Sequence, residues 1–402
     1  MRVLIAEKFE KVGVDGLKDL GCEVIHNPDV SAEDLPAMMR AIDPDVLIVR
    51  GKKVSGDALK AGTRLSLVIR AGAGVDSIDV KAASGLGVFV ANCPGKNSIA
   101  VAELVMGLIC ACDRRLPDQT ADLRAGKWNK KEYGKARGLY GRTLGVVGLG
   151  PIGREVIKRA QAFGMKVVAW SRSLTTEQAE AMGVAYCQNP IEVARLSDVV
   201  SVNVAANAET KNLVNAEFLK VMKPGAYLIN TSRGSVVDEA ALLKAIDEKG
   251  IRCGLDVFQN EPGEPVGAFS SEIARHGNVY GTHHIGASTD EAQIAVAHEV
   301  IRIMSCYIDS GEVHNCVNRL ARSSATHVLS VRHRNRPGVL SHVFKVLADE
   351  AINVEEVENI IYHGAEATCA KVHLDGCPKE DTVQRIRSGN ENIISVSLAT
   401  IE

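Results

Sequence analysis

Short apolar runs alternate with helical segments along the first 98 residues of this chain. Apolar runs without internal polar positions, separated by helices, are typical of a parallel sheet covered on both faces. The stretch 100–112 is long enough for a helix and almost wholly apolar, which predicts burial between domains or at a dimer interface. The expected strands of this first region lie at 3–5, 23–25, 46–49, 67–69 and 88–90.

A glycine-rich loop, residues 148–153, follows the apolar run 143–147 and opens a helical stretch. Another apolar run, 165–170, comes next, and the order strand, tight turn, helix, strand predicts a dinucleotide-binding unit. The first glycine permits the turn, the second lets backbone approach a pyrophosphate, and the third lets the helix pack on the strand. The N-terminus of that helix attracts the anion. Further strands are expected at 199–202, 226–230, 253–256 and 279–282.

After a helix expected at 290–308, the pattern loses its periodicity up to residue 325. Residues 326–402 then read as strand, helix, strand, strand, helix, strand. This order is the split, ferredoxin-like arrangement. We therefore expect an α/β protein with two doubly wound parallel sheets, followed by a small ferredoxin-like domain.

Composition narrows the classes of function. The chain has 402 residues, 46% hydrophobic and 24% charged, which suits two or three domains with ordinary cores. A net charge of −2 gives no electrostatic case for nucleic acid or an anionic membrane, and no apolar run approaches the roughly 20 residues that span a bilayer. Ten scattered cysteines form no C-x-x-C pair and no zinc spacing, so we expect reduced thiols, no metal site and a cytoplasmic location.

The residues after the run 165–170 bear on the choice of dinucleotide. An NAD site normally ends this strand with an acid for the ribose 2′-hydroxyl, but here Ser171 and Arg172 follow. A guanidinium pairs bidentately with phosphate, so this pair favours the 2′-phosphate of NADP. Alternatively, Arg172 only stacks on adenine while Ser171 still bonds a ribose hydroxyl. NAD and NADP both stay open at this point.

Three polar residues follow later strands, near the edge where a cofactor would lie: Arg233, Glu261 and His284. Each alone has an ordinary structural explanation, as a surface ion pair, a turn residue or a core histidine. Together they supply what hydride transfer from an alcohol requires. His284 would take the hydroxyl proton, Glu261 would fix the imidazole tautomer, and Arg233 would bind the substrate carboxylate.

The glycine-rich loop, residues 232–242 and residues 284–289 resemble the three signature regions of the D-isomer-specific 2-hydroxyacid dehydrogenases. The resemblance covers nearly the whole chain. It implies that Arg233, Glu261 and His284 are the catalytic residues, and that the cofactor is NAD, with NADP still possible. It also implies a flavodoxin-like substrate-binding domain interrupted by a Rossmann domain. The boundaries we expect are 1–98 and 289–315 for substrate binding, 99–288 for NAD binding, 316–325 for a linker and 326–402 for the last domain.

Other site residues follow from motifs that match the family. Arg50 and Lys52 end a strand and suit a phosphorylated substrate, although a solvated basic turn explains them equally well. Ser171, Ala205, Pro151 and His283 depart from the family, which usually has Asp, Pro, Arg and Pro there. The implied substrate-binding residues are Ala73, Gly74, Asn97 and Ser98. The implied cofactor-binding residues are Gly148, Gly150, Pro151, Ile152, Gly153, Ser171, Arg172, Ala205, Thr231, Ser232, Asp256, Gly286 and Ala287.

Residues 333–340 resemble the opening of an ACT regulatory domain, and His333, Asn335 and Asn353 match positions that contact L-serine in such domains. The resemblance implies a homodimer or homotetramer with a possible L-serine effector. It favours oxidation of 3-phospho-D-glycerate to 3-phosphohydroxypyruvate, the first step of L-serine biosynthesis. The alternatives are an NADPH-dependent glyoxylate/hydroxypyruvate reductase and, in another class, a catalytically silent amino-acid-binding regulator.

Overall fold

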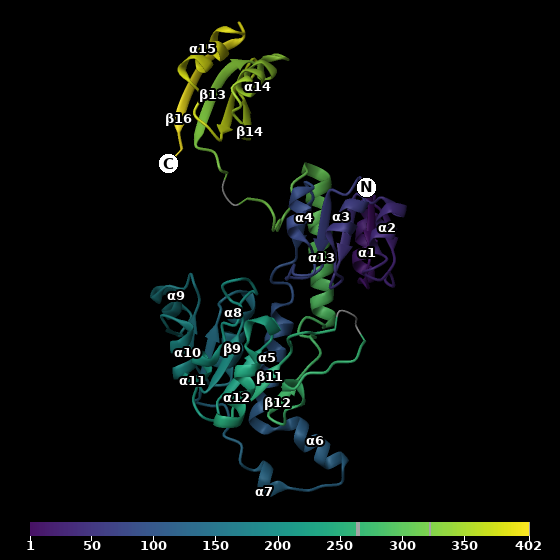
Figure 1. Cartoon of the computed structure of the whole chain (residues 1–402), viewed down its shortest axis with the longest axis vertical. Helices are drawn as coiled ribbons and strands as arrows, with labels where there is room; N and C mark the ends of the chain where they lie inside the picture. Colours follow the sequence, from purple (N-terminus) through teal and green to yellow (C-terminus); the bar gives the residue numbers. More distant parts are fainter. Residues whose placement is uncertain (263–265, 321–322, 402) are drawn as a thin grey trace. The chain divides into compact units, whose positions relative to one another are not determined.

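The computed structural model describes residues 1–262, 266–320 and 323–401. It divides into two compact units, Met1–Asn318 and Arg319–Glu402 (Figure 1). The first unit contains a first lobe, built on a five-stranded sheet, and a second lobe, built on a seven-stranded sheet. The second unit is built on a four-stranded sheet.

The strands of the first lobe are all parallel, in the order β2-β1-β3-β4-β5. This order reverses between β1 and β3, which confirms the predicted doubly wound sheet. The strands are β1 (Arg2–Ile5), β2 (Glu23–His26), β3 (Val46–Val49), β4 (Leu67–Arg70) and β5 (Phe89–Asn92). The helices between them are α1 (Lys11–Asp19), α2 (Leu35–Ile42), α3 (Gly56–Ala61) and α4 (Val80–Gly85).

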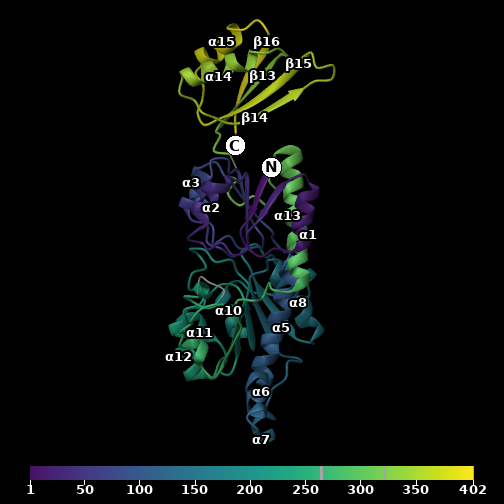
Figure 2. The ribbon, with the colours of Figure 1, turned by 90° about the vertical axis from the view of Figure 1, so that its right-hand side faces the viewer.

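Helix α13 (Asp290–Ser310) follows the second lobe in sequence but packs on the first lobe, alongside α1 (Figures 1 and 2). Its Val296 and Val300 side chains join Val3 and Ile5 in one buried core. The first lobe is therefore built from two separate stretches of the chain.

The chain after α13 also returns to the first lobe. Val317 N–H donates to the Val90 carbonyl at 2.8 Å, and Cys316 forms a β-bridge with Ala91. The first unit thus extends to residue 318, into the segment 316–325 that the sequence predicts as a linker. Residues 321–322 of that segment, and residue 402 of the predicted last domain, lie outside the described residues.

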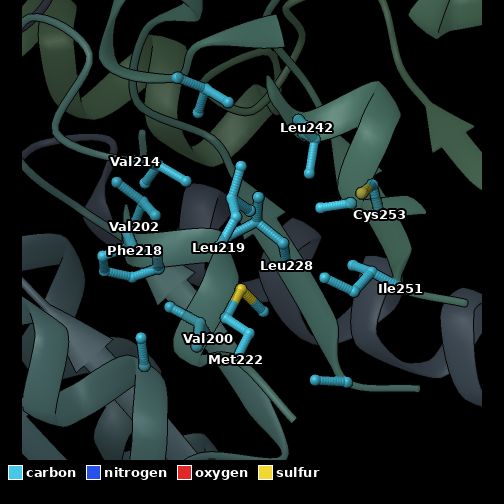
Figure 3. Packing of buried hydrophobic residues seen from close by; sticks show 14 of the residues in the cluster. Val200, Val202, Val214, Phe218, Leu219, Met222, Leu228, Leu242, Ile251 and Cys253 are labelled. Carbon is cyan, nitrogen blue, oxygen red and sulfur yellow. The ribbon is translucent and has the colours of Figure 1, made fainter. Parts of the chain in front are cut away.

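The second lobe has a parallel sheet in the order β8-β7-β6-β9-β10-β11-β12. Helices α5 and α8 cover one face of this sheet, and α10, α11 and α12 cover the other. The core on the second of these faces contains Phe218, Met222 and Leu228 (Figure 3). The strands are β6 (Thr143–Val147), β7 (Lys166–Trp170), β8 (Ala185–Tyr186), β9 (Val199–Val202), β10 (Tyr227–Asn230), β11 (Arg252–Leu255) and β12 (Val279–Gly281). The helices are α5 (Ser98–Arg114), α8 (Pro151–Ala162), α9 (Thr176–Ala181), α10 (Pro190–Leu196), α11 (Ala216–Val221) and α12 (Glu239–Lys249).

An arm formed by α6 (Leu116–Arg124) and α7 (Lys130–Tyr133) projects from the second lobe (Figure 2). No residue of α6 is buried, and the Trp128 side chain that follows is 81% exposed. The base of the arm is anchored to the lobe, since both Asp113 carboxylate oxygens accept from Gly138 N–H and one accepts from the Tyr227 hydroxyl at 3.1 Å. The sequence pattern gave no sign of this arm.

The second unit has an antiparallel sheet in the order β14-β15-β13-β16, which confirms the ferredoxin-like prediction. Leu329 and Val372 of the sheet pack with Val343 and Leu347 of one helix. The elements are β13 (His327–Arg334), α14 (Val339–Asp349), β14 (Val354–Ile361), β15 (Ala367–Leu374), α15 (Glu380–Ser388) and β16 (Ile393–Thr400). Among the described residues, no helix is long and apolar enough to cross a membrane.

Glu299, on α13, is a buried carboxylate that ties together three parts of the first lobe. It accepts a hydrogen bond from Asn315 at 2.8 Å and pairs with Lys96 Nζ at 3.2 Å. It also pairs with Arg302, one helical turn along α13. The Arg302 hydrogen bond is the largest influence on the pKa of Glu299, which is lowered to about 2 despite burial.

We expect Glu299→Gln to lower the free energy of unfolding at neutral pH by about 1–3 kcal/mol, because charge-assisted hydrogen bonds are lost. The pKa of this carboxylate is lower in the folded chain than the value of about 4.3 expected when unfolded. Its contribution is therefore complete above about pH 5 and is lost as the pH falls toward 2. Urea unfolding of both proteins at several pH values checks this, and a gap that stays constant down to about pH 3 would contradict it.

Candidate active site

His284 and Glu261 form a hydrogen-bonded pair beyond the carboxyl ends of β12 and β11. His284 Nδ1 lies 2.7 Å from Glu261 Oε2, and Glu261 Oε1 accepts the Phe258 backbone N–H at 2.8 Å. Burial alone would raise the pKa of Glu261, but these hydrogen bonds outweigh it and the pKa is lowered. The ionised carboxylate fixes a proton on Nδ1 and leaves Nε2 of His284 for proton exchange. The geometry thus pairs His284, and not the adjacent His283, with the carboxylate.

A second carboxylate, Asp256, holds the loop that carries His284. Asp256 follows β11, is only 1% exposed, and accepts Ile285 N–H at 2.8 Å and Gly286 N–H at 2.9 Å. It also accepts the Thr282 hydroxyl at 2.6 Å, while its carbonyl accepts His284 N–H at 2.8 Å. His284 has a φ of 53°, an unfavourable left-handed conformation that this network sustains. The structure thus bonds Asp256 to residues 282–289, the histidine loop. A contact of Asp256 with a cofactor stays a prediction.

Arg233 follows β10, in a turn organised by the buried Asn230. Asn230 Oδ1 accepts the Ser232 hydroxyl at 2.7 Å, and Asn230 Nδ2 donates to the Arg233 carbonyl at 3.0 Å. The Arg233 side chain reaches the first lobe, where Nε donates to Asp76 at 2.7 Å. Gly74 lies so close that a Cβ there would come within 2.1 Å of Arg233 Nη2. Asn230 and Asp76 were not singled out from the sequence, although Asp76 lies two residues after the predicted substrate-binding residue Gly74.

A cavity of about 350 Å³ lies beside Arg233 and Asp76. Its other lining residues come from the second lobe: Ala206, Asn207, Ala208, Lys211 and Ser235. Both lobes therefore contribute to the space next to Arg233. His284 and Glu261 do not line this cavity, so the structure brings Arg233 and the His–Glu pair to one sheet edge without enclosing them in one pocket.

The glycine-rich loop has the geometry that a bound dinucleotide needs. Gly148 has a φ of 98°, and a Cβ there would lie 2.6 Å from the Asn203 carbonyl. A Cβ on Gly153 would lie 2.2 Å from the Gly148 carbonyl, so the helix packs directly on the turn. A Cβ on Gly150, in contrast, would meet open space, which leaves room for a pyrophosphate at the N-terminus of α8. Pro151 lacks an N–H, so Ile152 is the first residue after Gly150 whose backbone N–H can donate to a pyrophosphate.

The remaining predicted cofactor residues follow strand ends at the same edge. Ser171 and Arg172 follow β7, and Ala205 follows β9. Thr231 and Ser232 follow β10, and the buried Gly286 with Ala287 follows β12. Arg172 is paired with Glu209, a residue that the sequence analysis did not consider.

Of the two basic residues predicted for the substrate, the structure brings one to the histidine loop. Arg50 Nη2 lies 3.2 Å from the hydroxyl of Ser288. The Lys52 ammonium instead contacts the Val30 carbonyl. The Glu7 carboxylate accepts the backbone N–H of Gly51 and of Lys52, both at 2.8 Å. The N–H groups of Gly51 and Lys52 are therefore already used.

Arg70, at the end of β4, is a cation that the sequence analysis missed. Burial, and then repulsion from Arg233, lower its pKa to about 10. Its Nε is buried and has no hydrogen-bond partner among the described residues. Gly72 permits its position, because a Cβ there would overlap Arg70 Nη1 at 1.6 Å. The available signal was an arginine at the end of a strand, followed closely by Gly72 and Gly74.

Asn97 and Ser98 stand at the start of α5. Asn97 Oδ1 and Ser98 Oγ are both buried and without a hydrogen-bond partner in the part of the chain that the structure describes. Ala73, also predicted for the substrate, has its carbonyl bonded by Asn92 at 2.6 Å. Buried polar atoms normally have partners, so the two unpartnered atoms fit a polar ligand.

The three residues predicted to bind serine do not come together within one copy of the second unit. His333 Nδ1 lies 2.8 Å from the Arg334 carbonyl, and its buried Nε2 has no partner among the described residues. Asn335 is bonded to Ala365 nearby. Asn353 precedes β14 at the other end of the sheet, since His333 pairs with Thr368 while Val354 pairs with Leu374. Six positions along a strand correspond to about 20 Å.

Two family models match the chain. Residues 106–286 match the D-isomer specific 2-hydroxyacid dehydrogenase NAD binding domain, and residues 329–374 match the AHAS small subunit-like ACT domain. The first match covers most of the second lobe and the second lies in the second unit. Both agree with the predicted kinds of domain.

Known relatives are similar to this chain over two thirds or more of its length. D-3-phosphoglycerate dehydrogenase of Methanocaldococcus jannaschii is 38% identical over 310 residues, which cover 76% of this chain and 57% of that protein. Hydroxypyruvate reductase of Thermotoga maritima is 39% identical over 284 residues, covering 68% of this chain and 89% of that protein. The structure of an NADPH-dependent glyoxylate/hydroxypyruvate reductase from Sinorhizobium meliloti, with NADP and malonate, has a TM-score of 0.68 at 30% identity, covering 79% and 96% of the two chains.

The fold, the His–Glu pair and the glycine-rich loop define a two-lobed protein that binds a nicotinamide dinucleotide of the NAD(P) class. The chain belongs to the D-isomer-specific 2-hydroxyacid dehydrogenase family, and an ACT domain follows its dinucleotide-binding core. It spans 57% of the length of the Methanocaldococcus relative.

Proposed function

We propose that the chain oxidises 3-phospho-D-glycerate to 3-phosphohydroxypyruvate with NAD(P), the first step of L-serine biosynthesis. The observation that carries the proposal is the hydrogen-bonded His284–Glu261 pair, which lies at the same sheet edge as Arg233. Arg50 reaches Ser288 on the loop that carries His284, and Arg70 lies near enough to Arg233 and Arg50 that, after burial, their charges lower its pKa. The substrate has a carboxylate and a phosphate, and arginine binds both in bidentate fashion. In this proposal residues 1–98 and 289–315 bind substrate, and residues 99–288 bind the cofactor.

The residues then divide the chemistry among them. His284 Nε2 accepts the proton of the substrate hydroxyl in oxidation and returns it in reduction. Glu261 stabilises the imidazolium that forms, because it keeps its negative charge. Arg233 Nη2, which is nearest to Gly74, orients the substrate carboxylate. The nicotinamide, when bound, exchanges the hydride with the carbon that carries this hydroxyl.

We propose L-serine as an effector of the ACT domain. The support is the family match and the buried, unpartnered Nε2 of His333. Since Asn353 lies about 20 Å along the sheet from His333, a serine site that uses both would take them from two copies of the chain.

We also propose that the chain forms a homodimer or homotetramer and works in the cytoplasm. The exposed arm at 116–140, with Leu123 59% and Trp128 81% exposed, is a surface that a second copy of this chain would cover. All ten cysteines are free, which fits a reducing compartment.

The second candidate is a glyoxylate or hydroxypyruvate reductase, and the Thermotoga relative favours it. That activity needs no phosphate site, so its substrates call for fewer cations than Arg50, Arg70 and Arg233 provide. A catalytically silent regulator is the third candidate, but it would have no use for an assembled His284–Glu261 pair.

Absorbance at 340 nm with phosphohydroxypyruvate, hydroxypyruvate and glyoxylate, each with NADH and with NADPH, tests the proposal. We expect the highest kcat/KM with phosphohydroxypyruvate, and a decrease in rate when millimolar L-serine is added. A kcat/KM with glyoxylate that equals or exceeds the value with phosphohydroxypyruvate would favour the reductase. If neither NADH nor NADPH is oxidised with any of the three substrates, only the catalytically silent regulator is left.

A further inference from the structure

An ion pair joins the ends of two strands in the second lobe. Arg172 follows β7, Glu209 lies in the loop after β9, and Arg172 Nη1 is 2.7 Å from Glu209 Oε2. In the sheet order, β6 lies between β7 and β9, and β6 leads into the glycine-rich loop. The ion pair therefore spans the carboxyl end of β6, where the strand order reverses and where such sheets bind dinucleotides.

The loop that carries Glu209 is held in place by its own hydrogen bonds. The Thr210 hydroxyl donates to the Ala205 carbonyl at 2.6 Å, and Asn207 Oδ1 accepts the N–H of Glu209 at 2.9 Å. At its start, the Asn203 N–H donates to the Val147 carbonyl of β6 at 2.8 Å. The backbone beneath Glu209 is thus tied to the strand that leads into the glycine-rich loop.

We propose that Glu209 is a specificity-determining residue that favours NAD(H) over NADP(H). The proposal rests on the proposed function only in that the chain binds a nicotinamide dinucleotide. Arg172 would attract a 2′-phosphate if it were free, but Glu209 neutralises it. A 2′-phosphate beside Arg172 would also meet the like charge of Glu209, whereas a ribose hydroxyl can donate to that carboxylate. Glu209 thereby supplies, from the loop after β9, the acid that position 171 lacks.

The ion pair can be altered without unfolding the protein. The two side chains are 74% and 71% exposed, and exposed pairs of this kind contribute little to stability. Removing the Glu209 charge should therefore change which dinucleotide binds rather than how stable the lobe is. The discrimination should also weaken as ionic strength rises, because exposed charges are screened.

Direct titration of the full-length protein with NADH and with NADPH, followed by nucleotide fluorescence without any substrate, tests the proposal. We expect wild type to bind NADH more tightly. Glu209→Gln should shift the ratio of the two Kd values by about tenfold toward NADPH, a typical size for losing one like-charge contact. Adding Arg172→Ala to Glu209→Gln should remove that gain. Glu217→Gln, an exposed acid on α11, is the matched control and should leave the ratio unchanged.

The outcomes separate this proposal from the proposed function. If wild type binds dinucleotide and Glu209→Gln leaves the ratio within twofold, or if Glu217→Gln shifts it equally, Glu209 does not determine specificity. If wild type prefers NADPH, the proposal is overturned as well. If wild type binds neither dinucleotide, the dehydrogenase function itself fails. These titrations contain no substrate, so their results do not depend on whether the substrate is 3-phosphohydroxypyruvate or another 2-oxo acid.

Discussion

Replacing His284 with alanine is expected to lower kcat by at least about 100-fold in both directions of the reaction. General acid–base catalysis typically contributes 10²–10⁴-fold, and His284 is the imidazole paired with a carboxylate, Glu261, at 2.7 Å. Stopped-flow and steady-state measurements at 340 nm, in the direction of oxidation and in that of reduction, check this expectation.

The neighbouring histidine is a matched control for this experiment. His283 is exposed, precedes His284 directly, and lies outside the pair with Glu261. His283→Ala should therefore keep kcat within about twofold of wild type. Near-normal turnover of His284→Ala, or an equal loss in His283→Ala, would contradict the proposed role of His284.

Glu261→Gln separates the role of the carboxylate from that of the imidazole. Glutamine can keep a hydrogen bond to Nδ1, but it cannot stabilise the imidazolium by charge. We therefore expect a smaller loss than in His284→Ala, and no further loss when the two substitutions are combined, because the two residues act as one unit.

The topology was predictable because it follows from patterns of apolar residues and glycines within short segments of the chain. Apolar runs interrupted by helices specify parallel strands, and Gly148 and Gly153 specify a turn that a side chain at either position would block. The positions of the three residues proposed as catalytic were predictable for a related reason. Arg233, Glu261 and His284 each follow a strand, and the carboxyl ends of parallel strands meet at one edge.

Contacts that depend on register between distant segments were not predictable. Arg172 and Glu209 are 37 residues apart, and only the position of β6 between β7 and β9 brings them together. The separation of His333 from Asn353 likewise follows from strand pairing, which the local sequence around either residue does not show. Arg70 gave only a weak signal, because a single arginine at a strand end says nothing about its burial.

Replacing Arg70 with methionine is expected to lower kcat/KM for phosphohydroxypyruvate by about 100-fold. Losing one partner of a desolvated, charge-assisted contact with the substrate typically costs that much. The loss with glyoxylate should be much smaller, because glyoxylate has no phosphate to bind. Comparing the two substrates in the 340 nm assay gives the result directly.

Stability distinguishes this role from a structural one. The Arg70 guanidinium is held at a site where burial and Arg233 both disfavour its charge, and its Nε has no partner among the described residues. Methionine keeps much of the volume and removes that charge, so the free energy of unfolding should stay the same or rise. Arg70→Lys keeps a charge but loses the planar fork, and it should fall between methionine and wild type in kcat/KM. If Arg70 had only a structural role, Arg70→Met would lower the free energy of unfolding. It would also reduce kcat/KM equally with phosphohydroxypyruvate and with glyoxylate. A less active but equally stable Arg70→Met protein would therefore identify Arg70 as a residue kept for the phosphate of the substrate.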